Sequence, residues 1–220
     1  MRYHKIHNLF KREGKKLLFD EYSLPEFEYL KDCSWEWTEK VDGTNVRVEY
    51  DSWGNENSVK FWGRNGNELP ENLKRELEKL LPIEKFKEYE APMTIFGEGY
   101  GCNIQKGHGY FPNEIDKVGF ACFDVNIGGI FIDRFNIEDI CSKMGIDVVP
   151  YFGEATIPVM VNRMRKSIIK SKISDNKVVE GFVGVPAGVR LFNHLGKRII
   201  VKIRYEDINK MPERGIDGKI

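Results

Sequence analysis

The sequence predicts a mixed α+β fold in which largely antiparallel sheets are flanked by helices. Short segments of apolar or alternating residues recur along the chain, as is typical of strands. Fewer segments show helical spacing, and they do not alternate with the strands in the regular order that a parallel sheet requires. No Pro/Gly/Ser-rich linker interrupts the 220 residues, so we expect a single domain over residues 1–220, compact or two-lobed.

The predicted strands are spread over most of the chain. They cover residues 35–40, 45–51, 58–64, 93–99, 118–125, 129–133, 178–185, 189–192 and 198–203. Side chains alternate along a strand, so Phe120 and Asp124 are expected on one face of their strand. Ala121, Phe123 and Val125 are expected on the other face.

Two segments between the strands have the features of complete helices. Residues 69–82 place leucines at helical spacing, and Pro82 ends the pattern. Residues 134–145 offer Asn136 as the N-cap and Gly145 as the stop. Both segments are therefore predicted to be helices that pack on a sheet.

A third helix is predicted over residues 157–172. It places Ile157, Val161, Met164 and Ile168 on one apolar stripe. The same segment is rich in basic residues: Arg163, Arg165, Lys166, Lys170 and Lys172. Such a face is usually only solvated, but it is also a candidate surface for phosphate contacts, as is the basic cluster at residues 11–16.

Bulk composition restricts the class of protein but not its partners. Lys+Arg and Asp+Glu both total 34, so net charge gives no general attraction to nucleic acid. The four cysteines form no C-x-x-C pair, and the N-terminus lacks the apolar core of a signal peptide. No apolar run approaches the ~20 residues that span a bilayer. We therefore expect a reduced, cytoplasmic protein with no membrane partner.

Lys40 stands in the segment EKVDGTN, where Gly43 would let a ligand approach the lysine closely. The four-residue pattern K-x-D-G is weak, and a solvated lysine in a surface turn is the competing interpretation. A free lysine is only ~0.04% neutral at pH 7 because its pKa is near 10.4. A nucleophilic lysine at this position therefore requires neighbouring cations or burial.

Two further segments offer groups that suit a nucleotide. Glu98 lies between glycines after an apolar strand, where its carboxylate would suit the hydroxyls of a ribose. The alternative is an exposed acid in a glycine-rich hairpin. Phe123 would suit stacking on a purine, whereas a buried core aromatic is the commoner fate of such a residue.

The remaining candidates suit phosphate or metal. Lys202 and Arg204 lie two residues apart on an apolar strand, so they share a face. Two cations among apolar residues are unfavourable unless they bind an anion, and phosphate is the natural one. Glu180 precedes a glycine and is a candidate ligand for a divalent metal, or else a surface acid. Arg64, between glycines, would reach a phosphate, or is an ordinary turn arginine.

Taken in order, six segments resemble the motifs of the covalent nucleotidyltransferases, which include ATP-dependent RNA and DNA ligases and mRNA capping enzymes. The segments are EKVDGTN, GRNG, FGEGYGCNIQKG, FACFDV, VEGF and VKIR. The resemblance is greatest to the RNA ligase 2 type, and it covers about residues 35–206. It implies a nucleotidyltransferase (ATP-grasp-like) core. From the length of 220 residues we expect no OB-fold domain.

The resemblance implies that ATP is the substrate and Mg²⁺ or Mn²⁺ the cofactor. Lys40 is similar to the nucleophile that attacks the α-phosphate and becomes lysyl-AMP. Glu39 resembles the residue whose backbone meets the adenine edge, and Asn45 resembles an essential amide near the phosphates. Arg64 is similar to the arginine near the ribose and the phosphate of the nucleic-acid end.

The later motifs imply the rest of the site. Glu98 is similar to the ribose-binding glutamate, Phe123 to the aromatic that stacks on adenine, and Glu180 to the metal-binding acid. Lys202 and Arg204 resemble the paired cations at the α-phosphate, although the family commonly has Lys-x-Lys there. Arginine keeps the charge, but its reach and donor geometry differ from those of lysine.

The implied function is an RNA ligase that transfers AMP to a 5′-phosphate end and joins that end to a 3′-hydroxyl, as in RNA repair. The chain ends soon after Arg204, so we expect end recognition to come from the surface of the core, from the basic helix, with Arg163, Arg165, Lys166 and Lys170 in particular, or from a partner protein. A capping-type guanylyltransferase and a non-catalytic nucleotide- or nucleic-acid-binding relative remain alternatives. RNA versus DNA ends stay undecided.

Overall fold

The computed structural model describes residues 2–53, 57–105, 107–114 and 116–212. The chain forms two compact units. The first unit comprises Met1–Tyr3 and Val41–Val149, and the second comprises His4–Lys40 and Pro150–Ile220. The chain therefore passes between the units after Tyr3, after Lys40 and after Val149. That the two units together form a single domain stays a prediction.

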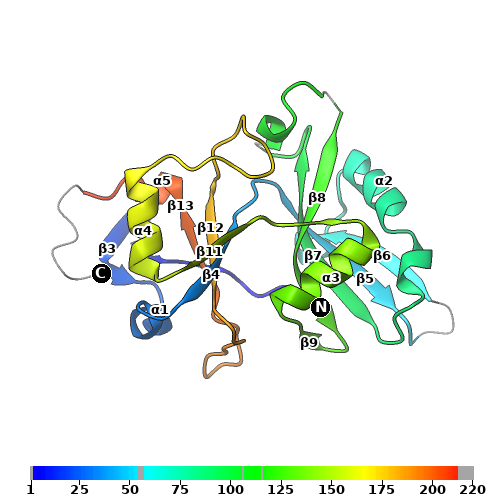
Figure 1. Ribbon diagram of the computed structural model, residues 1–220, viewed down its shortest axis with the longest axis horizontal. Coiled ribbons are helices and arrows are strands. Elements are labelled where there is room, and N and C mark those ends of the chain that lie inside the picture. The colour runs from blue at the N-terminus through cyan, green and yellow to red at the C-terminus, as the bar shows by residue number, and fades with distance from the viewer. Residues whose placement is uncertain (1, 54–56, 106, 115, 213–220) are drawn as a thin grey trace. The chain divides into compact units, whose positions relative to one another are not determined.

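A six-stranded sheet forms the centre of the first unit. Its order is β10-β8-β7-β5-β6, with β9 paired to β8. Strands β5 to β9 are labelled in Figure 1. The strands are β5 (Thr44–Asp51), β6 (Ser58–Gly63), β7 (Met93–Gly101), β8 (Val118–Ile127), β9 (Ile130–Phe131) and β10 (Asp147–Val148). All pairs are antiparallel except β10 with β8. This confirms the predicted, largely antiparallel α+β class.

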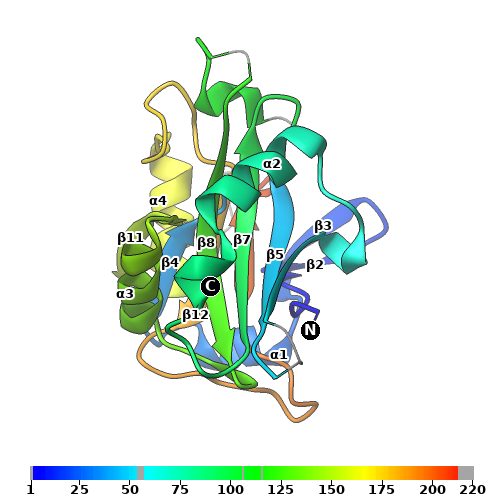
Figure 2. The ribbon, with the colours of Figure 1, turned by 90° about the vertical axis from the view of Figure 1, so that its right-hand side faces the viewer.

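Two helices, α2 (Glu71–Leu80) and α3 (Arg134–Met144), cover one face of this sheet (Figure 2). Leu73 and Leu77 of α2 pack with Ile137 of α3 and with alternate residues of the strands. The short 3₁₀ segments are η1 (Arg64–Gly66), η2 (Ile83–Phe86) and η3 (Gly107–Tyr110). The helix predicted over residues 69–82 is thus confirmed, with its end before Pro82.

The predicted N-cap of α3 is wrong. Asp133 is the N-cap, and its carboxylate accepts hydrogen bonds from both the backbone and the side-chain nitrogens of Asn136 at 2.9 Å. A carboxylate at this position satisfies a backbone N–H that the helix leaves without an intrahelical partner. Gly145 ends the helix as predicted, with a left-handed φ of 63°.

A five-stranded sheet forms the centre of the second unit, in the order β1-β13-β12-β4-β11. The strands are β1 (His7–Asn8), β4 (Trp35–Glu39), β11 (Tyr151–Ala155), β12 (Gly181–Pro186) and β13 (Val201–Arg204). Only β1 with β13 is parallel. A separate antiparallel hairpin consists of β2 (Phe10–Glu13) and β3 (Lys16–Tyr22).

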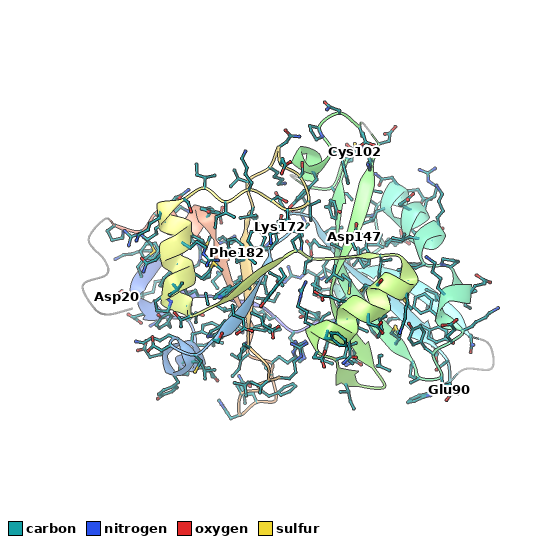
Figure 3. The ribbon with its side chains drawn as sticks, viewed as in Figure 1. Asp20, Glu90, Cys102, Asp147, Lys172 and Phe182 are labelled. Atoms are coloured by element: carbon teal, nitrogen blue, oxygen red, sulfur yellow. The ribbon has the colours of Figure 1, made fainter. Side chains whose placement is uncertain are left out.

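The helices of the second unit are α1 (Pro25–Leu30), α4 (Ile157–Lys166) and α5 (Tyr205–Ile208). Trp35, Trp37 and Phe182 form a buried core with Met160 and Val161 of α4. Phe182 is labelled in Figure 3. These core residues alternate along β4 and β12, so one face of the sheet is buried under α4. The residues that alternate with them point to the opposite face of the sheet.

The helix predicted over residues 157–172 ends earlier, at Lys166. Ser167 is extended, and Ile168 is 74% exposed instead of lying on the buried stripe. The hydroxyl of Tyr205 donates to the carbonyl of Ser167 at 2.7 Å and accepts from the N–H of Ile169 at 3.0 Å. These bonds hold the segment extended and so replace the hydrogen bonds of a further helical turn.

Several strand boundaries also differ from the predictions. Residues 189–192 form no strand, and only an isolated bridge joins Phe192 to Arg198. The strand predicted over 129–133 is reduced to Ile130–Phe131, and the last predicted strand begins at Val201. Among the described residues, none of the helices combines the length and apolar composition that crossing a bilayer requires.

Candidate active site

In the first unit, Asn45 and Glu98 lie directly opposite each other in register on β5 and β7. Their neighbours Val46 and Ile95 belong to the core under α2 and α3. Because side chains alternate along a strand, Asn45 and Glu98 point to the face that these helices do not cover. Two of the predicted nucleotide-binding residues therefore stand side by side.

Phe123 is the extra residue of a β-bulge in β8. Phe96 of β7 pairs with Asp124, whereas the next residue, Gly97, pairs with Cys122. An extra residue shifts the alternation of the strand, so Val125 joins the core under the helices together with Phe120. The predicted groupings of Phe120 with Asp124 and of Phe123 with Val125 are therefore wrong.

The side chain of Phe123 lies on the same face as Glu98. Tyr3 contacts both Phe123 and Phe96, with ring centroids 5.0 Å apart in each case. Phe96 precedes Glu98 by two residues on β7, so both point the same way. The structure thus brings Asn45, Glu98 and Phe123 together on one face of the first unit.

Gly43 is required by close packing beside Glu98. A Cβ at this position would lie 2.2 Å from the carbonyl oxygen of Gly99 and 3.0 Å from Cγ of Glu98. The neighbouring backbone N–H of Asp42 donates to the hydroxyl of Tyr110 at 3.0 Å. The glycine of the lysine motif therefore lets the backbone approach β7, and Tyr110 is a contact that sequence reasoning missed.

Arg64 lies at the same end of the sheet as Asn45. It follows Gly63, which pairs with Val46, and its side chain is exposed in η1. This position is compatible with the predicted contact to a phosphate. Lys106, the lysine of the segment FGEGYGCNIQKG, lies outside the described residues.

In the second unit, Lys40 follows the last residue of β4. Its backbone N–H donates to the carbonyl of Gly181 at 3.0 Å. Its Nζ lies 2.6 Å from Oε2 of Glu180, and the two side chains are 24% and 27% exposed. The predicted nucleophile and the predicted metal ligand are therefore a direct, solvent-accessible ion pair.

Lys202 and Arg204 share one face of β13, as expected, because Val201 and Ile203 are buried in the core. Gly181 of β12 pairs with Arg204 on one side and bonds to the backbone of Lys40 on the other. Neighbouring strands are ~4.8 Å apart, so the backbones of Lys40 and Arg204 are roughly 10 Å apart. Lys40, at the end of β4, and the two cations of β13 thus belong to one sheet, with β12 between them.

The guanidinium of Arg204 is held by acids of its own unit. Its NH2 group lies 3.2 Å from Oδ2 of Asp207, and its NH1 group lies 2.7 Å from Glu206. Asp207 is buried and also binds Arg12 of the β2–β3 hairpin. Arg204 is therefore anchored in a fixed direction, and Asp207 and Arg12 are contacts that the motif comparison did not reveal.

Glu39, next to the candidate nucleophile, is only 2% exposed and points into the second unit. It accepts a hydrogen bond from the hydroxyl of Ser171 at 2.6 Å and one from the N–H of Lys172 at 3.1 Å. Burial raises the pKa of its carboxyl above the usual 4.5, although these hydrogen bonds oppose the shift.

The raised pKa of Glu39 makes the free energy of unfolding depend on pH. The protonated Glu39 carboxyl contributes to the free energy of unfolding in full below pH 4.5. This contribution is lost as the pH rises through the raised folded-state pKa, because ionisation of a buried carboxyl is disfavoured. Glu39→Gln cannot ionise, so the free energy of unfolding of this variant, relative to that of wild type, should increase between pH 4 and pH 7. Urea denaturation at several pH values measures this difference in the free energy of unfolding. A variant whose free energy of unfolding falls relative to that of wild type as the pH rises would contradict the prediction.

The basic residues of α4 and of the following segment are only partly free to meet a ligand. Arg163 donates to the carbonyl of Phe152 at 3.5 Å, and Arg165 donates to that of Pro212 at 3.1 Å. Lys172, labelled in Figure 3, donates to the carbonyl of Tyr151 at 2.6 Å and lies 4.5 Å from the ring centroid of Phe152. Lys166 and Lys170 are exposed.

The predicted site residues thus form two sets, one in each unit. The first unit carries Asn45, Arg64, Glu98 and Phe123. The second unit carries Glu39, Lys40, Glu180, Lys202 and Arg204. That the two sets meet around one nucleotide stays a prediction.

Solved structures of RNA ligases share this fold. A Naegleria gruberi RNA ligase variant with AMP and Mn matches at a TM-score of 0.63 and 17% identity, covering 94% of this chain and 62% of that one. The N. gruberi RNA ligase with PPi matches at a TM-score of 0.64 and 16% identity, covering 93% and 60%. Another variant of that ligase, with ATP and Mn, matches at 0.61 and 15%, covering 95% and 64%.

These similarities show the class of the fold, a mixed α+β arrangement of largely antiparallel sheets with helices, as in solved RNA ligases; the part of the chain that is described contains no closed barrel. The model of the family named RNA ligase matches residues 34–203, and the chain belongs to that family. The chain spans about three fifths of the length of the solved ligases. Among curated protein sequences, none matches it.

Proposed function

We propose that this chain is an ATP-dependent RNA ligase whose Lys40 carries AMP. The observation that supports this most directly is the ion pair between Lys40 and Glu180, in the unit whose sheet also carries Lys202 and Arg204 on β13. Membership of the RNA ligase family supports the reaction class. The matched N. gruberi ligases were solved with AMP, ATP, pyrophosphate or Mn, which suits ATP as substrate with a divalent ion.

The proposed reaction has three phosphoryl-transfer steps. In the first, Nζ of Lys40 forms a bond to the α-phosphorus of ATP, the bond to pyrophosphate breaks, and the amine loses a proton. In the second, an oxygen of an RNA 5′-phosphate attacks the same phosphorus and the P–N bond breaks. In the third, an RNA 3′-hydroxyl attacks the activated 5′-phosphate, and AMP leaves with the electrons of the broken P–O bond.

The ion pair explains how Lys40 is held before the reaction. An ammonium group paired with Glu180 has no lone pair, so Lys40 must leave this pairing and lose a proton before it attacks. Lys202 and the anchored Arg204, both on β13 of the same unit, would then carry the positive charge that the phosphate oxygens need. The guanidinium of Arg204 would meet the phosphate oxygens in the direction that Asp207 and Glu206 fix.

The residues present are compatible with one weakly held divalent ion. Within residues 2–53, 57–105, 107–114 and 116–212, no group of three or more His, Cys, Asp or Glu side chains is placed to hold a metal. Mg²⁺ commonly binds through one or two carboxylates together with substrate phosphates and water. Glu180 would supply that carboxylate, and the ion would neutralise charge on the triphosphate.

The nucleic-acid end is the finer part of the proposal. The family name supports RNA ends as substrate. We propose that Lys166 and Lys170, both exposed, contribute phosphate contacts together with Arg163 and Arg165, and that a partner protein can supply further end recognition. Cytoplasmic location stays a prediction from the cysteine content.

One labelling experiment tests the proposed function. The protein is incubated with Mg²⁺ or Mn²⁺ and either α-labelled ATP or α-labelled GTP, and then with RNA that carries a 5′-phosphate and a 3′-hydroxyl. The proposal predicts protein labelling from ATP alone and joined RNA afterwards. Labelling from GTP alone would indicate a guanylyltransferase. Nucleotide binding without any labelling would indicate a non-catalytic relative.

A further inference from the structure

Tyr3 completes a group of four aromatic rings on the Glu98 face of the first unit. Its ring centroid lies 5.0 Å from that of Phe96, 5.0 Å from that of Phe123 and 6.1 Å from that of Phe131. Phe96 and Phe131 are themselves 6.0 Å apart. Aromatic pairs at these separations stabilise each other beyond the area that they bury.

Tyr3 also binds the residue that follows Phe123. Its hydroxyl donates to Oδ2 of Asp124 at 2.7 Å, while Oδ1 of the same carboxylate accepts from the backbone N–H of Val125 at 3.2 Å. Asp124 is only 2% exposed. A hydrogen bond to a carboxylate in such a buried position is strong and directional, so Tyr3 and Asp124 fix each other.

The bulge makes Phe123 depend on these contacts. As the extra residue of a bulge, Phe123 has no ladder partner on β7 that would fix its direction. Its ring meets that of Tyr3 edge-on, at an interplanar angle of 70°. Tyr3 thus restrains the Phe123 ring by an edge contact and restrains the adjoining backbone through Asp124.

We propose that Tyr3 is a positioning residue for the nucleotide base, acting through Phe123. The proposal rests on the proposed function, in which Phe123 stacks on adenine. Tyr3 does not touch the reacting atoms in this account. It keeps the Phe123 ring in the direction that stacking requires, so its loss weakens recognition of the base and leaves phosphoryl transfer to Lys40 intact.

The test measures the kinetics of AMP attachment for Tyr3→Phe, Tyr3→Leu and Tyr3→Ala. Tyr3→Ala should raise the KM for ATP about threefold to tenfold, the range expected from loss of an aromatic pair, with kcat within about twofold of wild type. Tyr3→Phe keeps the ring and should restore most of the affinity. Tyr3→Leu fills much of the space without an aromatic edge, so it reports on the ring if Tyr3→Ala does not fold. Phe135→Ala, which removes a 79% exposed aromatic of α3, is the matched control and should behave as wild type.

A base-specific readout separates positioning from a general structural effect. Adenosine and pyrophosphate are compared as inhibitors of AMP attachment, because only adenosine contains the base. In Tyr3→Leu, inhibition by adenosine should weaken about threefold to tenfold while inhibition by pyrophosphate stays unchanged. Equal weakening of both inhibitors, a fall in kcat without a change in KM, or an unchanged KM would overturn the proposal. Absence of AMP attachment in wild type would instead overturn the proposed function itself.

Discussion

Lys40→Ala protein is expected to lose ATP-dependent joining of RNA by more than about a thousandfold, yet to join RNA whose 5′ end already carries AMP. The side chain removed is the group that would form the P–N bond, and nucleophiles removed from other enzymes cost at least this much. An RNA that already carries AMP enters at the third step, which does not need Lys40 as a nucleophile. The measurement compares joining of 5′-phosphorylated and 5′-adenylated RNA.

The second unit provides a matched control for this experiment. Lys31 is also 24% exposed and also paired with a glutamate, with its Nζ 2.7 Å from Glu28. Lys31→Ala therefore removes a lysine of equal exposure and similar pairing that has no proposed part in the chemistry, and it should join both RNAs as wild type does. If Lys40→Ala still joined 5′-phosphorylated RNA with ATP, Lys40 would not be the nucleophile.

Glu180→Gln is expected to slow AMP attachment about a hundredfold to a thousandfold while leaving the protein folded. The variant keeps the shape of the side chain but removes the charge that pairs with Lys40 and that would bind the divalent ion. Its rate should also respond more steeply to the concentration of Mg²⁺, because the proposed metal ligand is weakened. Single-turnover labelling over a range of Mg²⁺ concentrations measures both effects.

The control for Glu180→Gln is Glu28→Gln, which breaks the Lys31 pair in the same way. A surface ion pair of this kind contributes little to stability and has no proposed part in the chemistry, so Glu28→Gln should label at the wild-type rate. If Glu180→Gln labelled as fast as wild type at every Mg²⁺ concentration, Glu180 would be neither the partner that holds Lys40 nor the metal ligand.

The sequence predicted the central strands of both sheets because their apolar periodicity is strong. Trp35 and Trp37 alternate with polar residues along β4, and the leucines of α2 keep helical spacing up to Pro82. The segment before residue 31 was not predicted. Its hairpin is rich in charge, with KREGKK around the turn, and α1 is too short for periodicity to identify.

The candidate site could be predicted only where the local sequence pattern determines the direction in which a side chain points. The shared face of Lys202 and Arg204 follows from alternation, and the structure shows it. The bulge at Phe123 does not follow from local pattern, because an extra residue is defined by its pairing with β7. The contacts of Tyr3 with Asp124 and of Arg12 with Asp207 join residues 121 and 195 positions apart, which no local pattern encodes.

The most direct test of the central claim is the mass of the protein after incubation with ATP and Mg²⁺, followed by fragmentation of the peptide that contains EKVDGTN. We predict an increase equal to one AMP, located on Lys40, reversed by added pyrophosphate and absent in Lys40→Ala. AMP on another residue, or no increase at any Mg²⁺ or Mn²⁺ concentration, would contradict the assignment of Lys40 as the residue that carries AMP.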